Sequence, residues 1–304
     1  MPEISPIVSE INRLKRDRNA VVLAHYYQTG DLQEIADFVG DSFDLSRKAK
    51  DTGAEMIVFC GVRFMAESAK ILSPHKTVLL PVPDAGCPMA DMVTPEDVRA
   101  LRARYPQAAV ACYVNSSCDV KAESDVCVTS SNAVKIVRAL TETQVIFVPD
   151  QNLGRYVASQ VPEKEIILHS GFCPIHHRLK PEEADAARRL HPNAVLLAHP
   201  ECTWEVLQKA NFVGSTAQIL RYAEQAEAGE FLIATEEGVL HELRKRSPGK
   251  TFYPLTPNLV CVNMKKTRLQ DLRDALLYTQ HVIQLDEALM NRARRCLERM
   301  LQMA

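Results

Sequence analysis

The chain has 304 residues, with 36 Lys or Arg against 38 Asp or Glu, so its formal charge is −2 at pH 7. This charge argues against a nucleic-acid-binding protein, which would carry a basic excess. The longest apolar runs, such as Ala20 to Ala24, are too short to cross a bilayer, and the opening MPEISPIVSE has no basic or apolar signal region. We therefore expect a globular cytoplasmic protein with no membrane and no nucleic-acid partner.

An internal repeat begins with three short apolar runs that each end abruptly in polar groups. This is typical of a buried parallel strand that enters a loop. The runs are NAVVLAHYY from Asn19, QAAVACYVN from Gln107 and NAVLLAHPE from Asn193. Aligned on the alanine before the polar end, they place His25, Cys112 and His199 at intervals of 87 residues.

Each copy continues in the same order. A small polar step comes first and a helical pattern follows it: GDS at 40–42, TSS at 129–131 and GST at 214–216. A second apolar run follows (MIVFC, VIFVP, FLIAT), then a second helical segment. A third run closes each copy at a cysteine, and these cysteines, 86 and 88 residues apart, are Cys87, Cys173 and Cys261. Amphipathic helical segments between the copies start at Ile7, Pro95 and Pro181.

This alternation of helix and strand predicts an α/β fold with small parallel sheets covered on both faces. We expect three pseudo-symmetric α/β/α sandwich units, triplicated around a central cavity, at 1–88, 89–175 and 176–266. The segment 267–304 has a helical pattern, and we expect it to pack back on the first unit.

Polar residues at the helix starts predict an anion site. In parallel sheets, ligands bind beyond the carboxyl ends of the strands, where helix N-termini favour phosphate or carboxylate. Ser42, Ser130 and Ser215 occupy similar steps in the three copies. They are either plain N-caps or ligands of a small molecule with several negative groups.

The closing cysteines predict a metal centre. The chain has nine cysteines but no CxxC pair, so a metal site has to be assembled from distant cysteines. Three converging thiolates suit a zinc ion or an iron–sulfur cluster and leave one position open for a Lewis acid. The alternative for any cysteine is a buried free thiol.

Side chains after the first strand of each copy predict proton transfer. His25, Tyr27, Tyr113, Asn115, His199 and Glu201 follow these strands, and His176 lies three residues after Cys173. His and Glu move protons, and Tyr does so or polarises a carbonyl. A structural histidine is the alternative at each histidine position.

A series of motifs resembles the quinolinate synthase (NadA) family. It includes HYYQTGDLQEIADFVGDS, PDAGCPMADM, CYVNSS, FVPDQNLGRYVA, GFCPIHHR, AHPEC, VGSTAQIL, ATEEGVLHEL and CVNMKKT, in order from about residue 20 to residue 267. The resemblance implies condensation of iminoaspartate with dihydroxyacetone phosphate to quinolinate, phosphate and water. It also implies one [4Fe–4S] cluster per chain, held by Cys87, Cys173 and Cys261, with an open iron that acts as a Lewis acid.

The resemblance also implies roles for single residues. His25 and Tyr27 would line the triose side, Tyr27 helping isomerisation, and Tyr113 and Asn115 would contact the bound intermediate. His199 and Glu201 would serve as acid and base, with His176 as a nearby polar contact. The anion-binding residues at the helix starts would be Ser42, Ser130, Ser215 and Thr216.

Two other functions are compatible with these residues. One is a zinc- or iron-dependent aldolase or dehydratase that uses the same three cysteines on another multi-anionic substrate. The other is a redox-sensing regulator, although no basic DNA-binding module is visible. For the synthase, an L-aspartate-oxidising enzyme would be the functional partner that supplies iminoaspartate.

Overall fold

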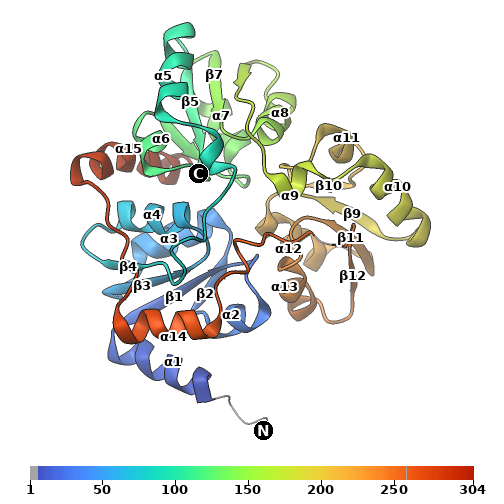
Figure 1. Cartoon of the computed structure of the whole chain (residues 1–304). Coiled ribbons are helices and arrows are strands. Elements are labelled where there is room, and N and C mark those ends of the chain that lie inside the picture. The colour runs from blue at the N-terminus through green and yellow to red at the C-terminus, as the bar shows by residue number, and fades with distance from the viewer. Residues whose placement is uncertain (1–5, 258) are drawn as a thin grey trace.

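The computed structural model describes residues 6–257 and 259–304, and within these residues it contains three four-stranded sheets (Figure 1). Every strand pair in them is parallel. The three sheets have the same strand order, β2-β1-β3-β4, β6-β5-β7-β8 and β10-β9-β11-β12. The predicted triplicated α/β class is therefore confirmed. Each sheet falls within one predicted unit, and the unit boundaries themselves stay a prediction.

The strands are short, and the central ones are buried. The first sheet has β1 (Ala20–His25), β2 (Phe38–Gly40), β3 (Met56–Cys60) and β4 (Thr77–Leu79). The second has β5 (Ala109–Tyr113), β6 (Val126–Val128), β7 (Gln144–Val148) and β8 (Glu165–Leu168). The third has β9 (Val195–Ala198), β10 (Phe212–Val213), β11 (Glu230–Ala234) and β12 (Thr251–Pro254). The third apolar run of each copy becomes a strand only over its first residues, and its cysteine lies in the loop that follows.

Helices cover both faces of each sheet (Figure 1). Those of the first unit are α1 (Pro6–Asp17), α2 (Gly30–Ile35), α3 (Ser42–Asp51) and α4 (Arg63–Leu72). The second unit has the 3-10 helix η1 (Ala90–Met92), α5 (Pro95–Arg104), α6 (Cys118–Ala122), α7 (Ala133–Ala139) and α8 (Gln151–Gln160). The third has α9 (Pro174–His177), α10 (Pro181–Leu190), α11 (Trp204–Leu207), α12 (Thr216–Gln225) and α13 (Val239–Arg246).

A side-chain clamp recurs in all three units and shows how deep the triplication goes. In each unit an Asp or Asn before the short edge strand accepts a hydrogen bond from a backbone N–H of the central strand. A basic residue of the helix that precedes the central strand (α1, α5 or α10) binds the same Asp or Asn side chain. The sets are Lys15–Asp37–Val22, Arg102–Asp125–Val110 and Arg188–Asn211–Leu196. Asp37, Asp125 and Asn211 are 88 and 86 residues apart, so the copies differ in length by two residues.

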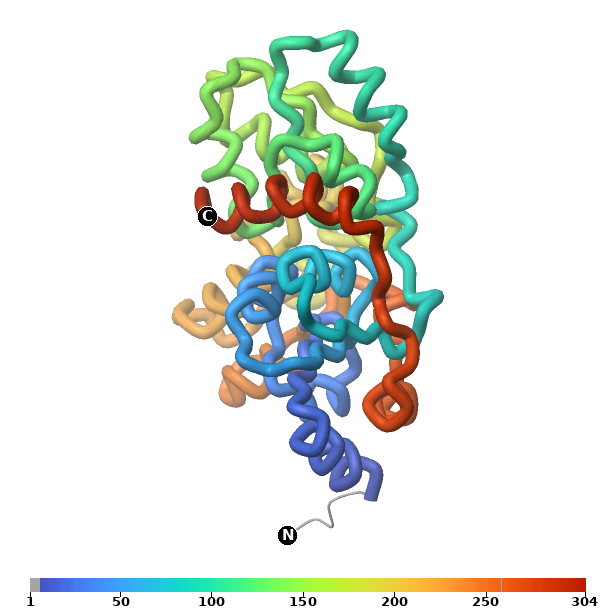
Figure 2. The backbone as a smooth tube through the Cα atoms, turned by 90° about the vertical axis from the view of Figure 1, so that its left-hand side faces the viewer, coloured from blue at the N-terminus to red at the C-terminus, as the bar shows by residue number. Residues whose placement is uncertain are grey.

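The two C-terminal helices pack on different units. Helix α14 (Leu269–Tyr278) lies against α1 and β3 of the first unit. Helix α15 (Glu287–Met303) crosses between the first two units (Figure 2) and packs mainly on α6 and β6 of the second, besides α4. This differs from the expectation that the whole segment returns to the first unit. The reason is the apolar stripe of α15, which includes Cys296 and Leu297 and joins the core shared by both units; Cys296 Sγ lies 3.0 Å from Cys127 Sγ of β6.

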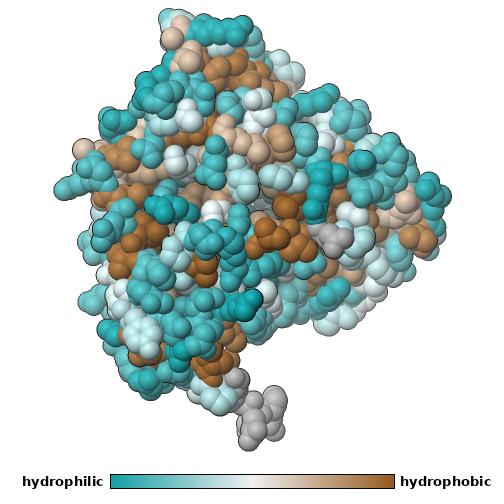
Figure 3. All heavy atoms as spheres, in the orientation of Figure 1, coloured by the Kyte–Doolittle hydropathy of each residue, from teal (hydrophilic) through white to brown (hydrophobic). Residues whose placement is uncertain are grey.

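The viewed surface is mixed in character. Figure 3 shows separate apolar groups among mostly hydrophilic side chains on this face. Within residues 6–257 and 259–304, no helix has the length and apolar character needed to span a bilayer.

Candidate active site

One pocket collects side chains from all three units, beyond the carboxyl ends of the central strands. Of the predicted site residues, all but Ser215 line it: His25, Tyr27, Ser42, Cys87, Tyr113, Asn115, Ser130, Cys173, His176, His199, Glu201, Thr216 and Cys261. Ser215 is fully buried and serves as the N-cap of α12, where its side chain accepts a hydrogen bond from Gln218 N. The pocket thus joins predicted residues that lie up to 236 positions apart in the chain.

Strand register shows which residues of the three copies are equivalent. The last pairs of the central strands are Ala24 with Cys60, Cys112 with Val148, and Ala198 with Ala234. Cys112 therefore matches the alanines and is buried in its strand. The residues that follow match one another as His25–Tyr113–His199 and, two positions on, Tyr27–Asn115–Glu201.

The alignment of Cys112 with the two histidines is therefore wrong by one residue. Its cause is the two-residue difference in length between the copies, which an alignment on alanine conceals. With the correct register, each unit contributes two polar side chains to the pocket from two equivalent positions, one at the carboxyl end of its central strand and one two residues later.

Glu201 is the centre of a buried hydrogen-bond network. Its Oε1 accepts a 2.7 Å hydrogen bond from the Tyr113 hydroxyl, and its Oε2 lies 2.7 Å from His176 Nδ1. Burial alone would raise the pKa of Glu201, but His199, His176 and the hydrogen bond of Tyr113 outweigh it and lower the pKa to about 2. Burial, followed by the charge of Glu201, raises the pKa of Tyr113. The pair is therefore a carboxylate that accepts from a protonated phenol.

Tyr27 is held from two other segments of the chain. Its hydroxyl lies 2.7 Å from Thr235 Oγ1 and accepts a 3.0 Å hydrogen bond from Thr216 Oγ1. Thr235 Oγ1 in turn lies 2.9 Å from His176 Nε2, so Tyr27 is connected to Glu201 through Thr235 and His176. Burial raises the pKa of Tyr27 well above its usual value, and the hydroxyl keeps its proton.

The two equivalent histidines share one local geometry. Nδ1 of His25 accepts from Tyr27 N at 3.1 Å, and Nδ1 of His199 accepts from Glu201 N at 3.3 Å. Nε2 of His199 lies 3.2 Å from Ser130 Oγ. Burial, more than any neighbouring charge, lowers the pKa of both histidines to about 3. Both rings are neutral at pH 7, so each can donate from one nitrogen and accept at the other.

The helix starts differ from the simple N-cap prediction. Ser42 is the first residue of α3, and the N-cap is Asp41, whose Oδ1 accepts from Phe43 N and Asp44 N. Ser130 lies in the turn before α7. Ser42, Ser130 and Thr216 are equivalent by the 88- and 86-residue spacing, and all three line the pocket.

Asn115 carries an unmet hydrogen-bonding group. Its Oδ1 is buried and has no hydrogen-bond partner among the described residues. A buried polar atom without a partner costs free energy, which a bound ligand group would recover.

The three predicted ligand cysteines line the same pocket and share one local turn. In each, the backbone N–H four residues onward donates to the cysteine carbonyl, from Asp91 at 3.3 Å, His177 at 2.9 Å and Lys265 at 3.1 Å. Backbone N–H groups within this turn favour the negatively charged sulfur and so act to lower the thiol pKa. Burial raises the pKa of all three thiols, and that of Cys87 to about 12. Such N–H donors stabilise sulfur that bears negative charge, as in a metal thiolate.

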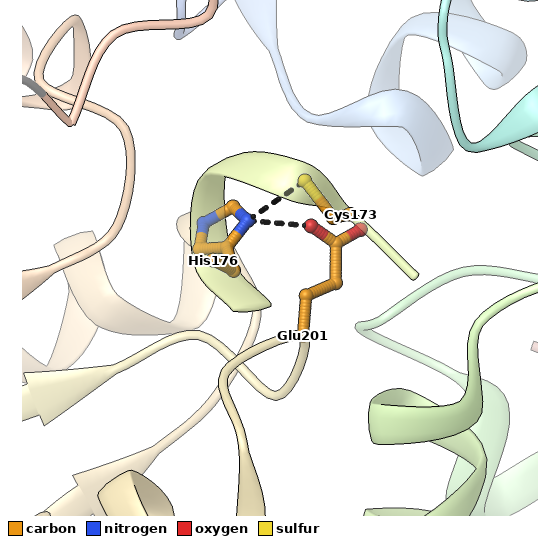
Figure 4. Close-up of side chains that lie close together, drawn as sticks. All are labelled: Cys173, His176 and Glu201. Atoms are coloured by element: carbon orange, nitrogen blue, oxygen red, sulfur yellow. Dashed lines mark hydrogen bonds and ion pairs between the residues drawn. The ribbon is translucent and has the colours of Figure 1, made fainter. Parts of the chain in front are cut away.

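A different group in the pocket has the spacing for a single metal ion. The ligand atoms of Cys173, His176 and Glu201 lie within 4.8 Å of one another (Figure 4). Within the described residues no other set of three His, Cys, Asp or Glu side chains meets this limit, the three cysteines included. Ligands about 2.3 Å from one tetrahedral zinc ion would lie roughly 4 Å apart. In a cluster each cysteine binds a different iron, so a wider spacing of the sulfurs suits a cluster better than one ion.

The sequence did not identify several residues of the pocket. Asp41 and Thr129 belong to the polar steps and Glu236 belongs to the ATEEG motif, so the sequence marked these segments without assigning the residues a role. Met65 and Met264 also line the pocket; Met264 lies in the CVNMKKT motif, but an apolar side chain gave no reason to predict a chemical role.

Comparisons with known proteins extend over nearly the whole chain. A family model described as quinolinate synthetase A protein (NadA) matches residues 9–302. A quinolinate synthase of Alkaliphilus metalliredigens is 56% identical over 296 residues, covering 97% of this chain and 98% of that protein. Those of Caldicellulosiruptor bescii and Methanoregula boonei are 55% and 51% identical, each covering 99% of both chains. With this coverage and identity, the chain belongs to the quinolinate synthase family of enzymes.

Proposed function

We propose that the protein condenses iminoaspartate with dihydroxyacetone phosphate to form quinolinate, phosphate and water. The observation that carries this proposal is the single pocket, in which family motifs from all three units meet. The two substrates bring two carboxylates and a phosphate. Ser42, Ser130 and Thr216 place hydroxyl groups near the starts of α3, α7 and α12, where backbone N–H groups and the helix dipole also favour anions.

Three cysteines would hold a [4Fe–4S] cluster in this pocket: Cys87, Cys173 and Cys261. Three observations support this assignment: the three thiols line one pocket, each begins the same backbone turn, and their sulfurs do not all lie within 4.8 Å of one another. When bound, such a cluster supplies one iron without a protein ligand, which acts as a Lewis acid on a substrate hydroxyl or carboxylate.

Glu201, Tyr113 and His199 are proposed to move protons. The Glu201 carboxylate is a base whose Oε1 is aligned by the Tyr113 hydroxyl. Neutral His199 has Nε2 directed at Ser130, so this nitrogen can exchange a proton with a substrate bound at the anion site. The Nδ1 atom of His199 lies 3.7 Å from Glu201 Oε2, so the two proton carriers are adjacent. Asn115, with its unpaired Oδ1, would bind a donor group of the intermediate.

Tyr27 and His25 are proposed to act on the triose side of the pocket. The Tyr27 hydroxyl is protonated and fixed by Thr235 and Thr216, so it can donate a hydrogen bond to a substrate carbonyl during isomerisation. His25 packs edge-on against the Tyr27 ring with centroids 4.5 Å apart. His176 would act through its contacts with Glu201 and Thr235.

One observation favours a second candidate, a single-metal aldolase or dehydratase. Cys173, His176 and Glu201 have the spacing for one ion and would leave a coordination position open. This candidate uses one of the three cysteines, whereas the synthase requires all three.

We also propose a cytoplasmic location and supply of iminoaspartate by an L-aspartate-oxidising enzyme. The support for the location is that all nine cysteines are free thiols. Such thiols fit a reducing compartment.

Replacement of Cys87 by Ala tests the proposal. Anaerobically purified wild-type protein should form quinolinate from the two substrates, and Cys87→Ala should hold little iron and form none. Cys60→Ala is the matched control, because Cys60 is fully buried in β3 and does not line the pocket. Quinolinate formation by Cys87→Ala at the control's rate would refute the ligand assignment. Wild-type protein that holds one metal ion without sulfide and forms no quinolinate would favour the single-metal candidate.

A further inference from the structure

The loops that carry the three cysteines are fastened by the same backbone hydrogen bond. In each unit, the third residue after strand β3, β7 or β11 donates its backbone N–H to the carbonyl oxygen two residues before the cysteine. The pairs are Arg63 to Ala85, Gln151 to Gly171 and Glu237 to Leu259, at 2.8, 2.8 and 2.9 Å. The three cysteine loops are therefore equivalent in structure as well as in sequence order.

The residue just before each donor is different in the three units. It is Val62 in the first unit, Asp150 in the second and Glu236 in the third, at intervals of 88 and 86 residues. Both carboxylates are fully buried. Burial of a carboxylate is costly unless several donors compensate it, so the partners of Asp150 and Glu236 indicate what they are for.

Asp150 binds the Cys173 loop to helix α8. Its Oδ2 accepts a 3.2 Å hydrogen bond from Cys173 N. Its Oδ1 accepts from Asn152 N and Leu153 N, at 2.8 and 2.9 Å, as the N-cap of α8. Asn152 then donates from Nδ2 to the backbone oxygen of Glu201. One carboxylate therefore fixes Cys173 relative to the segment that carries Glu201.

Glu236 does the same for the Cys261 loop. Its Oε1 accepts a 3.0 Å hydrogen bond from Cys261 N, and its Oε2 accepts from Gly238 N at 2.7 Å. Lys265 pairs with this carboxylate at 3.0 Å and also donates to the backbone oxygen of Tyr27 at 2.5 Å. Glu236 therefore fixes Cys261 relative to the segment that carries Tyr27.

We propose that Asp150 and Glu236 are positioning residues that hold the backbones of Cys173 and Cys261 in place for the metal centre. This inference rests on the proposed cluster function. Groups that orient a metal ligand typically change metal affinity by about 10- to 100-fold when they are removed. The first unit has no such group, because the Val62 side chain cannot accept a hydrogen bond.

Isosteric amides test this role while keeping the helix cap. Asp150→Asn retains an oxygen for the N-terminal N–H groups of α8, and Asn is a favoured N-cap residue. It places an amide NH2 where the Cys173 N–H needs an acceptor. Glu236→Gln makes the same change at Cys261 and serves as the second, independent variant. Asp286→Asn is the matched control, because Asp286 caps α15 through Leu289 N and lies outside the pocket.

Three measurements separate positioning from general support of the fold. They are the rate of iron release to a chelator, the electron paramagnetic resonance spectrum of the reduced cluster, and the Tm of the cluster-free protein. We expect Asp150→Asn and Glu236→Gln to release iron about tenfold faster or more than wild type. Their spectra should change, whereas the spectrum of Asp286→Asn should stay that of wild type. The cysteine N–H left without an acceptor should lower their cluster-free Tm as well.

Release rates and spectra equal to wild type in both variants would overturn the inference. A fall in cluster-free Tm with an unchanged spectrum would also overturn it, since that result marks a structural role only. Wild-type protein that holds neither iron nor sulfide would overturn the proposed function itself, which keeps the two failures distinct.

Discussion

Replacement of Glu201 by Gln tests the assignment of the central base. The change removes the negative charge and leaves one oxygen for two donors, the Tyr113 hydroxyl and His176 Nδ1, each 2.7 Å from the carboxylate. A positioned general base typically contributes 10²- to 10⁴-fold to a rate, or about 3–5 kcal/mol in the activation free energy. We therefore expect kcat to fall by about 10²- to 10⁴-fold while iron and sulfide content stay unchanged.

The assay follows quinolinate formation under anaerobic conditions in wild type, Glu201→Gln and Glu242→Gln. Glu242 is a suitable control because it is also buried and ion-paired, through Arg246, but lies on α13 outside the pocket. A Glu201→Gln enzyme with more than half of the wild-type kcat would refute the assignment. If Glu201→Gln lost both the cluster and the activity, Glu201 would instead be a residue that supports the metal centre.

Three further predictions concern stability and binding. Burial lowers the pKa of His25 from 6.5 to about 3, so below pH 6.5 the unfolded chain takes up a proton that the folded chain does not. Cluster-free wild type should lose about 2 kcal/mol of unfolding free energy from this residue between pH 6.5 and 4.5, and His25→Gln should lose less than the exposed control His75→Gln; equal losses would contradict the assignment. Asn115→Ala should raise KM about tenfold without lowering Tm, since Oδ1 has no partner among the described residues, and an unchanged KM would exclude substrate contact. Leu297→Ala should cost about 2–5 kcal/mol in denaturant unfolding, because Leu297 is fully buried where α15 joins two units; a cost under about 1 kcal/mol would refute that role of the helix.

Much of the fold could be predicted because each unit repeats one pattern of apolar runs and amphipathic helices. The central strands β1, β5 and β9 are nearly continuous apolar segments that end in polar groups. The short edge strands β2, β6 and β10, at two or three residues each, could not be predicted. A segment so short has no measurable periodicity, and its conformation is decided by pairing with the neighbouring strand.

The placement of α15 shows a different limit of the sequence. Its apolar stripe predicts a buried face but contains no information about which unit that face meets. The register of the repeat was also beyond a motif alignment, because Ala24, Ala111 and Ala198 are equally spaced while the structural equivalents are not. The pairing of the strands resolves the register and shows that Tyr113 is the structural equivalent of His25 and His199.

The pocket was more accessible to prediction than its support. Polar residues that follow buried strands, such as Glu201 and Tyr113, stand out because nothing structural requires them there. Asp150 and Glu236 did not stand out, because an acid before a helix or within a loop is common. Their importance depends on two contacts, with Cys173 N and Cys261 N, that only the three-dimensional structure shows.

The most direct test of the account is the amount of iron and acid-labile sulfide per chain in anaerobically purified protein. A cubane cluster on Cys87, Cys173 and Cys261 predicts about four of each. Iron or zinc without sulfide, at about one ion per chain, would contradict the cluster and direct attention to the Cys173, His176 and Glu201 group.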